Sequence, residues 1–428
     1  MYLLSYDIGT SGVKTCLYSL SAGRLTPIAS TLREYGLTIF PDGGVEQDPE
    51  EWWTALCGST RALRETHAAE LAQIAGISFC SQMQSVVLVD REGNALRPAM
   101  SYLDQRAQEQ RRNGLEHGIK VSGMNLRKVL VSLRQTGAVA ASVKDPIWKY
   151  HWVRDNEPEI FAKVYRWLDV KEYLIGRMTG EFILSEDSAF ATLLLNIRAK
   201  PMRWSQRVCK LFGVNIAHLP PIVPCTAVVG VLRAKQAAEL GLNPGVKVVA
   251  GGGDASLIPV GAGAVNLADT HIYWGTSGWV GTVTNKQKVD LNAMIASVVG
   301  ARQGYYNYFA ELETAGKCFQ WVRDHLALDE INIYLDEIGA SRSSEDPEPL
   351  YRDLYGYMSR IVDTVAPGSG NVLFTPWLHG NRCPFEDPKA RGMFFNIGID
   401  TGKSELIRAV IEGVCFHLRW FLETEEKK

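Results

Sequence analysis

One short stretch near the N-terminus combines hydroxyl, basic and acidic side chains around a turn that is flanked by glycines. The turn Gly9–Gly12 holds Thr10 and Ser11 between its glycines, and glycine permits the positive φ angles of a hairpin turn. The hydroxyls and backbone N–H groups of such a turn would converge on one point, which suits a phosphate. Lys14 would add a positive charge, and the Asp7 carboxylate could hold a hydrated Mg²⁺ that bridges to phosphate oxygens. The stretch therefore predicts a phosphate-binding turn, with an ordinary polar hairpin as the alternative.

A second acidic residue follows three glycines, in the stretch Gly251–Asp254. The apolar run 246–250 before it predicts a buried strand, and the glycines would let substrate and phosphates approach the backbone closely. At the end of that strand, Asp254 could accept a proton from a substrate hydroxyl during phosphoryl transfer. The alternative is an aspartate that caps the helix after it.

The turn Gly275–Gly278 repeats the Gly-Thr-Ser-Gly sequence of the first turn, again between two strand-like runs. This short repeat suggests that the chain has two related halves. Two such turns facing one another would clamp a polyphosphate, with Thr276 as a second hydroxyl contact. A plain hairpin is the alternative here as well.

Amide and charged side chains cluster at two places that are expected to lie at strand ends or in loops. Gln82–Gln84 supplies amides, and Asp104 with Arg106 supplies a carboxylate and a guanidinium group. Polyol hydroxyls need both donors and acceptors, so these side chains suit a sugar. The alternative is that they are ordinary polar residues of the protein surface.

The elements that must position these residues alternate between strand and helix patterns, which is typical of an α/β fold. Asp48 followed by Pro49 predicts the start of a helix that runs to about His67. The stretch 328–350 is expected to be an exposed loop between helices. Further helical patterns cover 147–156, 171–178 and 406–421, and strand patterns cover 1–8, 24–40, 74–89, 246–250 and 270–280.

The composition restricts the classes of function. The 428 residues are enough for about two or three domains, and 46% hydrophobic residues is ordinary for a globular protein. A formal net charge of −2 without a basic cluster gives no support for nucleic-acid binding. No run of about 18 apolar residues predicts a membrane span, and Asp7 interrupts the apolar start that a signal peptide would need. The eight scattered cysteines fit a reduced, cytoplasmic protein.

Taken together and in order, these motifs resemble the FGGY family of carbohydrate kinases, and most of all its xylulose kinases, over nearly the whole chain. The positions that carry the resemblance are Asp7, Gly9–Ser11, Lys14, Gln47–Pro49, Trp52, Gln82, Met83, Arg97, Pro98, Asp104, Arg106, Gly251–Asp254, Gly275–Ser277, Gly316, Gln320, Trp321, Leu373–Pro384, Asp387–Gly392 and Arg408–Gly413.

The resemblance implies two ribonuclease-H-like domains of the actin and hexokinase ATPase type with a cleft between them, the second of them truncated at its C-terminus. Residues 1–245 would form the sugar and phosphate side, and residues 246–428 the nucleotide side. It also implies a cytoplasmic enzyme that uses Mg²⁺ to transfer the γ-phosphoryl group of ATP to a sugar hydroxyl. Such an enzyme could form a homodimer. The resemblance assigns Asp254 as catalytic base, and Asp7 and Asp254 as the residues that hold Mg²⁺. The residues it assigns to the sugar are Met83, Gln84, Asp104, Arg106 and Asp254. The residues it assigns to ATP are Thr10, Ser11, Lys14, Gly275, Thr276, Gly316 and Gln320.

The chain departs from the pattern of xylulose kinases in its expected sugar pocket and at its C-terminal end. Gln84 stands where histidine is usual, Ala255 where an amide is usual, and Tyr102 where tryptophan is usual. The first two changes remove hydrogen-bonding groups, so a xylulose-like pentulose or a related sugar or polyol is expected as acceptor. Soon after Gly413 the chain ends, before a glycine-rich segment that contacts adenosine in the family, so the adenine site is expected to be incomplete.

Two alternative functions follow from these departures and from the acidic residues. One is a non-catalytic sugar- or nucleotide-binding protein of the same fold, or an inactive truncated form. The other is a glycoside hydrolase, which needs two carboxylates facing a glycosidic bond. No pattern in the chain pairs carboxylates in that way, and the two Gly-Thr-Ser turns would then have no role.

Overall fold

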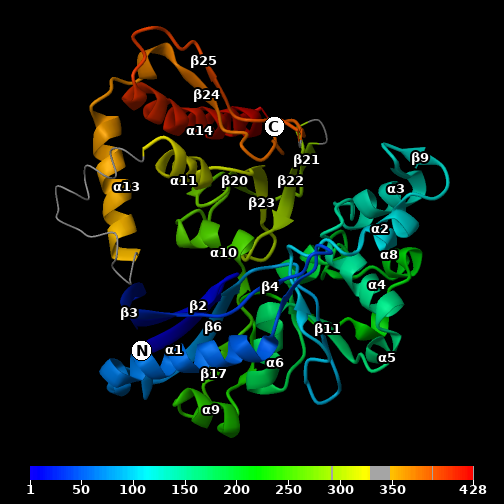
Figure 1. Ribbon diagram of the computed structural model, residues 1–428. Helices are drawn as coiled ribbons and strands as arrows, with labels where there is room; N and C mark the ends of the chain where they lie inside the picture. The colour runs from blue at the N-terminus through cyan, green and yellow to red at the C-terminus, as the bar shows by residue number, and fades with distance from the viewer. Residues whose placement is uncertain (291–292, 328–347, 388, 428) are drawn as a thin grey trace. The chain divides into compact units, whose positions relative to one another are not determined.

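Each of the two units into which the chain folds has its own β-sheet (Figure 1). The computed structural model describes residues 1–290, 293–327, 348–387 and 389–427. The first unit comprises Met1–Gly261 with Val298–Tyr306, and the second comprises Ala262–Ser297 with Asn307–Lys428. The first unit thus continues past the expected boundary at 245/246, because the strands that follow residue 246 pair with its sheet.

The sheet of the first unit combines an antiparallel meander with parallel strands. Strand β1 pairs antiparallel with β2 and parallel with β6, and β6 pairs parallel with both β17 and β18. Along the sheet the order is β16-β17-β6-β1-β2-β3, with β18 beside β6. The bounds of these strands are β1 Tyr2–Ile8, β2 Gly12–Ser21, β3 Arg24–Glu34, β6 Ile74–Ser81, β16 Val228–Val231, β17 Lys247–Val249 and β18 Gly252–Gly253.

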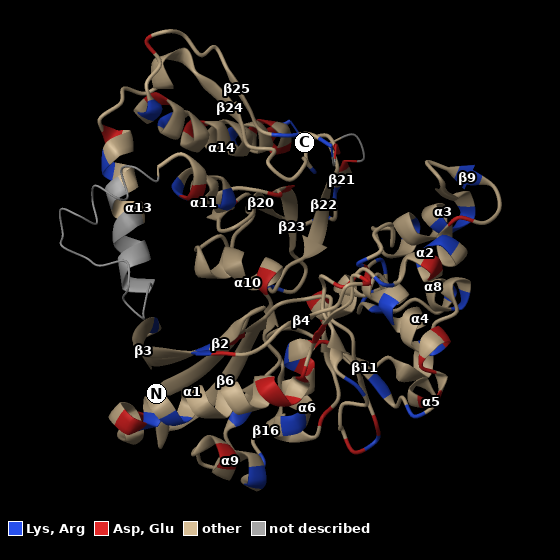
Figure 2. Cartoon of the chain, viewed as in Figure 1, with Lys and Arg blue, Asp and Glu red and all other residues tan. Residues whose placement is uncertain are grey.

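Helix α1 (Pro49–Leu71) shows why the local sequence forms these elements. Asp48 caps it by accepting the Glu50 N–H at 2.9 Å, which confirms the predicted start. Its exposed face carries acidic and basic residues (Figure 2), while Trp52 and Leu56 are buried in the core of the unit. At His67, the predicted end, the backbone leaves helical geometry, but the helix resumes and continues to Leu71.

The remaining elements of the first unit are short strands and helices that surround the sheet. Helix α4 includes the predicted stretch 147–156, and α6 includes the predicted stretch 171–178. Their bounds are β4 Thr38–Ile39, β5 Val45–Gln47, β7 Val87–Val89, β8 Ala99–Met100, α2 Gln108–Leu115, β9 Lys120–Val121, β10 Met124–Asn125, α3 Leu126–Gln135, α4 Pro146–Asn156, α5 Pro158–Phe161, β11 Arg166–Leu168, α6 Val170–Thr179, β12 Leu184–Ser185, α7 Glu186–Ala191, β13 Leu195–Asn196, β14 Arg203–Trp204, α8 Gln206–Phe212, β15 Ile222–Val223, α9 Ala234–Leu240 and α10 Asp254–Gly261.

The second unit is built on a sheet of order β19-β20-β23-β22-β21. The predicted strand–turn–strand at 270–280 is confirmed as the antiparallel pair β19–β20. Helix α14 contains the predicted helix 406–421, and its Ile407, Val414 and Phe421 side chains lie in the core of this unit. The bounds are β19 Thr270–Trp274, β20 Gly278–Thr284, β21 Val289–Asp290, β22 Ile295–Val299, β23 Tyr306–Leu312, α11 Gly316–His325, α13 Glu348–Asp363, β24 Leu373–Thr375, β25 Met393–Phe395 and α14 Lys403–Glu426.

The first turn does not use the backbone freedom of its glycines. Gly9 and Gly12 permit positive φ angles but do not adopt them. Gly12 instead allows close approach of β3, because a Cβ there would lie 2.8 Å from the Arg33 carbonyl oxygen. The loop predicted at 328–350 falls mostly on residues 328–347, which lie outside the described part of the chain, but its last three residues begin helix α13, so there the prediction is wrong. Among the described residues, no helix combines the length and apolar character needed to cross a membrane.

Candidate active site

Two predicted acidic residues meet at one edge of the first sheet, where β1, β6 and β18 end. Asp7 on β1 pairs in register with Cys80 on β6, and Cys80 pairs in register with Gly252 on β18. Asp254 follows β18 directly, as the first residue of α10. Because all three strands are parallel, their carboxyl ends lie on the same side, which is where ligands bind in open α/β sheets.

The environment of Asp254 raises its pKa to about 6, chiefly through burial and further through the negative charges of Asp7 and Asp187. The Ala255 N–H donates to its Oδ1 at 2.7 Å and opposes part of that rise. A carboxylate of this pKa is still mostly ionised at neutral pH, and it is a stronger base than an ordinary aspartate. Asp254 thus accepts an N–H at the start of α10, as the helix-cap alternative expects, and its carboxylate is also a proton acceptor at the sheet edge.

The three glycines before Asp254 serve contacts within the protein. A Cβ on Gly251, which has φ +66°, would lie 2.1 Å from the Phe79 carbonyl oxygen. A Cβ on Gly252 would approach an Asp187 carboxylate oxygen to 2.9 Å, and one on Gly253 would lie 2.1 Å from the Met83 sulfur. We expected the glycines to leave room for substrate, but the space beside each of them is filled by neighbouring protein atoms.

The first predicted phosphate turn is held rigidly by residues far from it in sequence. The Gly9 N–H donates to the Gly12 carbonyl at 2.9 Å, and the Tyr35 N–H donates to the Ser11 carbonyl at 3.1 Å. The Gln47 amide donates to the Thr10 carbonyl at 2.7 Å. The side chains of Ser11 and Lys14 are exposed, and the Thr10 hydroxyl lies 3.2 Å from the Tyr102 hydroxyl. A fixed backbone with exposed hydroxyl and ammonium groups has the chemistry to contact an anion.

The donor set at this edge fits a magnesium ion. The Asp7 carboxylate is close enough to Asp254 to raise its pKa, and a bridging cation would relieve the repulsion between the two charges. Within the described residues no group of three or more acidic, histidine or cysteine side chains could hold a metal. Magnesium suits such a site because it is usually held by one or two carboxylates, water and substrate phosphates.

Met83 and Gln84, both predicted at the sugar, lie on a loop that is fixed from two sides. Asp169, the N-cap of α6, accepts the Gln84 N–H at 2.8 Å and the Ser85 N–H at 3.1 Å. The buried Lys149 ammonium donates to the Gln84 carbonyl at 2.6 Å. Gln84 has φ +65°, an uncommon conformation for this residue type, and these three bonds hold it there.

Asp104 and Arg106 are joined to Glu46 in a buried ion network. Both guanidinium contacts with Asp104 Oδ2, at 2.7 and 3.0 Å, use the oxygen that also accepts the Val45 N–H. Glu46 pairs with Arg106 and with Arg97. Asp104 is 0% exposed, so its carboxylate is fully occupied by protein groups, whereas Arg106 stays 9% exposed along its side chain.

In the second unit, the four predicted nucleotide residues line one cavity of about 420 Å³. The turn before β20 is fastened to α11, because the Gly316 N–H donates to the Gly275 carbonyl at 2.7 Å and the Ala315 N–H donates to the Thr276 carbonyl at 3.0 Å. The residues that line the cavity are Trp274, Gly275, Thr276, Gly316, Phe319, Gln320, Tyr355 and Ile411. The sequence analysis did not predict the aromatic and aliphatic side chains that line the cavity. Only Phe319 could have been found from the sequence, because it lies one helical turn after Gly316 and therefore on the same face of the helix.

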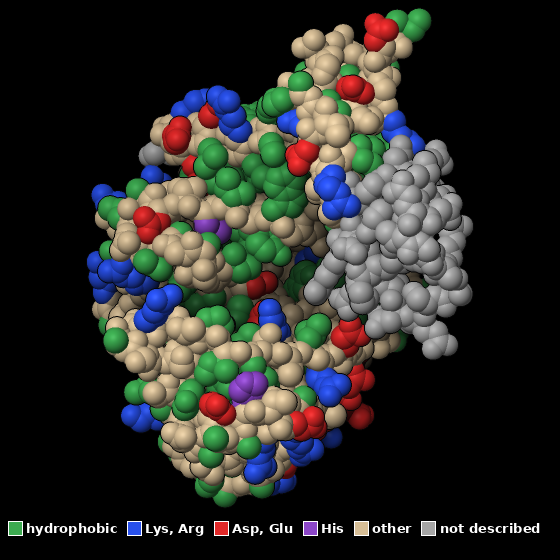
Figure 3. Space-filling model, turned by 90° about the vertical axis from the view of Figure 1, so that its left-hand side faces the viewer, with side chains coloured by type: hydrophobic (Ala, Val, Ile, Leu, Met, Phe, Trp, Pro, Cys, Tyr) green, Lys and Arg blue, Asp and Glu red, His purple; other side chains and the backbone are tan. Residues whose placement is uncertain are grey.

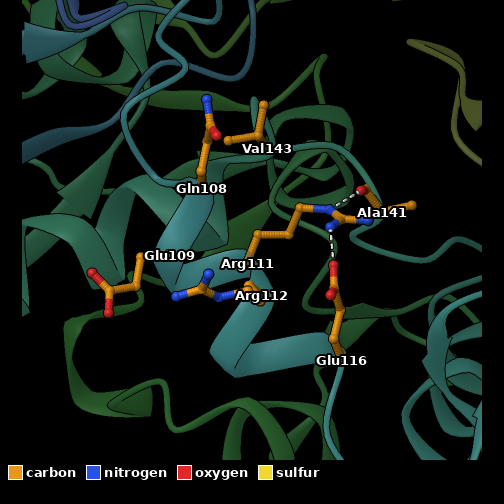
Figure 4. Close-up of a pocket in the computed structure, with 7 residues that line it drawn as sticks. All are labelled: Gln108, Glu109, Arg111, Arg112, Glu116, Ala141 and Val143. Carbon is orange, nitrogen blue, oxygen red and sulfur yellow. Dashed lines mark hydrogen bonds and ion pairs between the residues drawn. The ribbon is translucent and has the colours of Figure 1, made fainter.

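A larger cavity of about 550 Å³ lies against α2 in the first unit (Figure 4). Arg111 points across it, where it pairs with Glu116 at 2.6 Å and donates to the Ala141 carbonyl at 2.5 Å. None of the predicted site residues lines this cavity. Because Arg111, the cation that points across this cavity, is already paired, we assign the chemistry to the sheet edge instead.

Comparison with known proteins gives one consistent result. The profile of the FGGY family of carbohydrate kinases, N-terminal domain, matches residues 2–261, and that of its C-terminal domain matches residues 271–428. A xylulose kinase of Lactococcus lactis is 30% identical over 426 residues, which cover 100% of this chain and 77% of that protein. A gluconokinase of Bacillus subtilis is 28% identical over 419 residues, 97% of this chain and 75% of its own length. The structure of a ligand-bound xylulose kinase from Lactobacillus acidophilus superposes with a TM-score of 0.78 at 26% identity, over 97% of this chain and 76% of that one.

Proposed function

This chain belongs to the FGGY family of carbohydrate kinases and is an ATP-dependent sugar kinase, and we propose that its acceptor is a xylulose-like pentulose or a related uncharged sugar or polyol. The observation that carries the proposal is the placement of Asp254. It lies beside Asp7 at the sheet edge and directly after Gly253, against which Met83 packs. A proton acceptor and an expected sugar contact are thereby held next to one another.

In the proposed reaction, Asp254 accepts the proton of a sugar hydroxyl while that oxygen attacks the γ-phosphorus of ATP. The bond between the γ-phosphorus and the oxygen bridging to the β-phosphate breaks, and ADP leaves with the electron pair. Mg²⁺, held by Asp7 and Asp254 largely through water, would neutralise charge on the phosphates. The residues proposed to hold ATP are Thr10, Ser11, Lys14, Gly275, Thr276, Gly316 and Gln320, and those proposed at the sugar are Met83, Gln84 and Arg106, with Asp104 acting through Arg106.

The charges near the proposed sugar residues favour an uncharged acceptor over an aldonate. An aldonate carboxylate needs a cation to replace its lost hydration. Arg106 is already paired with Asp104 and Glu46, and Lys149 is bound by two backbone carbonyls. Asp254 adds a further negative charge. Hydroxyls, in contrast, can use the amide of Gln84 and the remaining donors of the Arg106 guanidinium.

A coupled ADP-release assay tests the proposal, with D-xylulose, D-ribulose, glycerol and D-gluconate as acceptors and with ATP and Mg²⁺ present throughout. We expect ADP release with one or more of the uncharged acceptors and none above background with gluconate. If gluconate gave the highest kcat/KM, the acceptor class would be wrong while the kinase assignment would stand. Calorimetry on the same protein addresses the non-catalytic alternative, which predicts binding of sugar or nucleotide without any ADP release.

A further inference from the structure

Behind β18 lies a buried cluster of charged and hydroxyl side chains that the proposed reaction does not use. Asp187 on α7 is 1% exposed, and Lys171 and Glu172 in the first turn of α6 are 0% exposed. The hydroxyls of Ser185 and Ser188 complete the cluster. Because these side chains are buried, none of them can touch a substrate, so any part they play in the reaction is indirect.

The Asp187 carboxylate contacts both residues of β18. Its Oδ2 accepts the Gly253 N–H at 2.7 Å. A Cβ on Gly252 would lie only 2.9 Å from the same oxygen, so the carboxylate also lies against that residue. Asp254 is the next residue of the chain, and the direction of its side chain therefore depends on the backbone that Asp187 holds.

The other Asp187 oxygen is anchored in turn. Its Oδ1 accepts the Ser188 N–H at 2.9 Å, the Cys225 thiol at 3.3 Å and the Ser185 hydroxyl. With both oxygens bonded, the carboxylate cannot rotate without breaking several contacts. This makes it a fixed support for β18 and more than a filler of space.

Lys171 supplies the positive charge that such a buried carboxylate requires. Its ammonium group donates to the Ser185 hydroxyl at 2.6 Å and the Ser188 hydroxyl at 2.7 Å, and it pairs with Glu172. Burial by itself would raise the pKa of Asp187, but Lys171 and the hydrogen bonds hold that pKa below its ordinary value. The carboxylate is thus ionised and a strong acceptor for the Gly253 N–H.

We propose that Asp187 is a positioning residue for phosphoryl transfer, which fixes the Gly252–Gly253 backbone and through it the carboxylate of Asp254. The inference rests on the proposed function, because it assumes that Asp254 is the base. Its physical reason is geometric: a general base must lie within hydrogen-bond reach of the hydroxyl it deprotonates, and a small displacement lowers the rate without weakening substrate binding.

Asp187→Ala tests the proposal, with Ser188→Ala as a matched control that alters the same cluster but keeps the bond to Gly253. Kinetics are measured by ADP release and stability by thermal unfolding. For Asp187→Ala we expect kcat to fall by about 10- to 100-fold while the KM for acceptor and ATP changes less than about threefold. For Ser188→Ala we expect kcat within about twofold of wild type, even if its Tm falls as much as that of Asp187→Ala.

A second pair of variants perturbs the same contact without removing the carboxylate, in case Asp187→Ala does not fold. Gly252→Ala places a methyl group against Asp187 Oδ2, whereas Gly261→Ala, on α10, meets nothing within 4 Å. We expect the first to lower kcat at nearly constant KM and the second to leave both unchanged. The double variant Asp187→Ala/Asp254→Asn should be no slower than Asp254→Asn alone, because Asp187 acts through Asp254.

Three outcomes would overturn the inference. Wild-type kcat in folded Asp187→Ala or Gly252→Ala would show that the contact only stabilises the fold. Additive losses in the double variant would show that Asp187 acts by a route other than Asp254. A wild-type chain that releases no ADP with any acceptor would instead refute the proposed function, and the inference would fail with it.

Discussion

At the scale of single residues, the site depends on how Asp7, Cys80 and Asp254 are placed by strand register. Asp7 lies on β1 and Asp254 directly follows β18, the two strands pair with β6, and Cys80 of β6 is in register with Asp7 and with Gly252. Burial is the largest cause that raises the pKa of the Cys80 thiol, and the negative charges of Asp7 and Asp254 raise it further. The thiol is therefore neutral. The edge therefore presents two acidic groups and no thiolate at Cys80, as the proposed Mg²⁺ ion and the proposed general base require.

Replacement of Asp254 by asparagine should abolish most phosphorylation and leave sugar binding intact. Asparagine has the same shape but cannot accept the hydroxyl proton, and a general base contributes about 10²- to 10⁴-fold to rate. The measurements are ADP release for turnover and calorimetry for sugar affinity. Turnover within about tenfold of wild type would show that another group takes the proton.

At the scale of elements, the start of α6 supports both parts of the site in the first unit. Asp169, its N-cap, holds the Gln84 loop, and Lys171 in its first turn holds the hydroxyls next to Asp187. One helix start thus links the proposed sugar loop and strand β18, which precedes Asp254. A helix is well suited to this because its backbone geometry fixes the spacing of its side chains.

We expect Asp169→Ala to weaken sugar binding about tenfold, since two loop N–H groups lose their acceptor and Gln84 is released from its φ +65° conformation. Calorimetry with the best acceptor measures the change. Ser205→Ala is the matched control, because Ser205 caps α8 in the same unit by accepting the Val208 N–H at 3.1 Å. Both variants should lose about 1 kcal/mol of stability from the missing cap, but only the first should lose sugar affinity. Equal sugar affinity in the two variants would contradict the role of Asp169.

Helix α4 carries a histidine that should make the stability of the first unit depend on pH. His151 is 3% exposed, and burial, together with the charge of Arg154, lowers its pKa to about 4. The folded protein keeps the ring neutral while the unfolded chain protonates near pH 6.5, so the free energy of unfolding decreases as the pH falls from about 6.5 towards 4.

Urea unfolding at pH 7 and pH 5 measures this effect by comparing wild type with His151→Phe. Over this range the wild type should lose about 2 kcal/mol more of its unfolding free energy than the variant. Substitution of the exposed His117 by glutamine is the control and should keep the wild-type pH dependence. If His151→Phe kept it as well, the ring would not be the titrating group.

At the scale of the whole molecule, the proposed sugar residues all belong to the first unit and the cavity lined by the predicted nucleotide residues to the second. On the face drawn in Figure 3, acidic and basic side chains are interspersed. The proposed ATP residues are divided, since Thr10, Ser11 and Lys14 belong to the first unit and the four residues of the cavity to the second. Under the proposed function, substitutions at the cavity should therefore affect the nucleotide more than the sugar.

Gly316→Ala should weaken nucleotide binding about tenfold or more and leave sugar affinity unchanged. Its Cβ would lie 2.5 Å from the Gly275 carbonyl oxygen, which would force the turn and α11 apart at the edge of the cavity. Calorimetry with ADP and, separately, with sugar gives both affinities. Gly398→Ala, whose Cβ would meet only a side-chain oxygen at 3.9 Å, is the control in the same unit. Loss of sugar affinity in Gly316→Ala would show that the two ligands depend on the same residues.

Sequence by itself determined the features that depend on neighbours along the chain. The opening hairpin, the capped start of α1 at Asp48, and the order of strand, glycines and Asp254 could all be predicted, because turn, cap and strand preferences are properties of short segments. The Gly-Thr-Ser-Gly turn was predicted in the same way, although neither of its glycines has a positive φ and Gly12 instead serves close packing against β3.

Only the tertiary structure decided which residues support that chemistry. Asp187 reaches Gly253 across 66 positions of the sequence, and Asp169 reaches Gln84 across 85. The same holds for Asp104, whose carboxylate is buried against the Val45 N–H across 59 positions of the sequence. Local preferences carry no information about such contacts, because they exist only once the sheet has brought distant strands together and excluded water from the space between them.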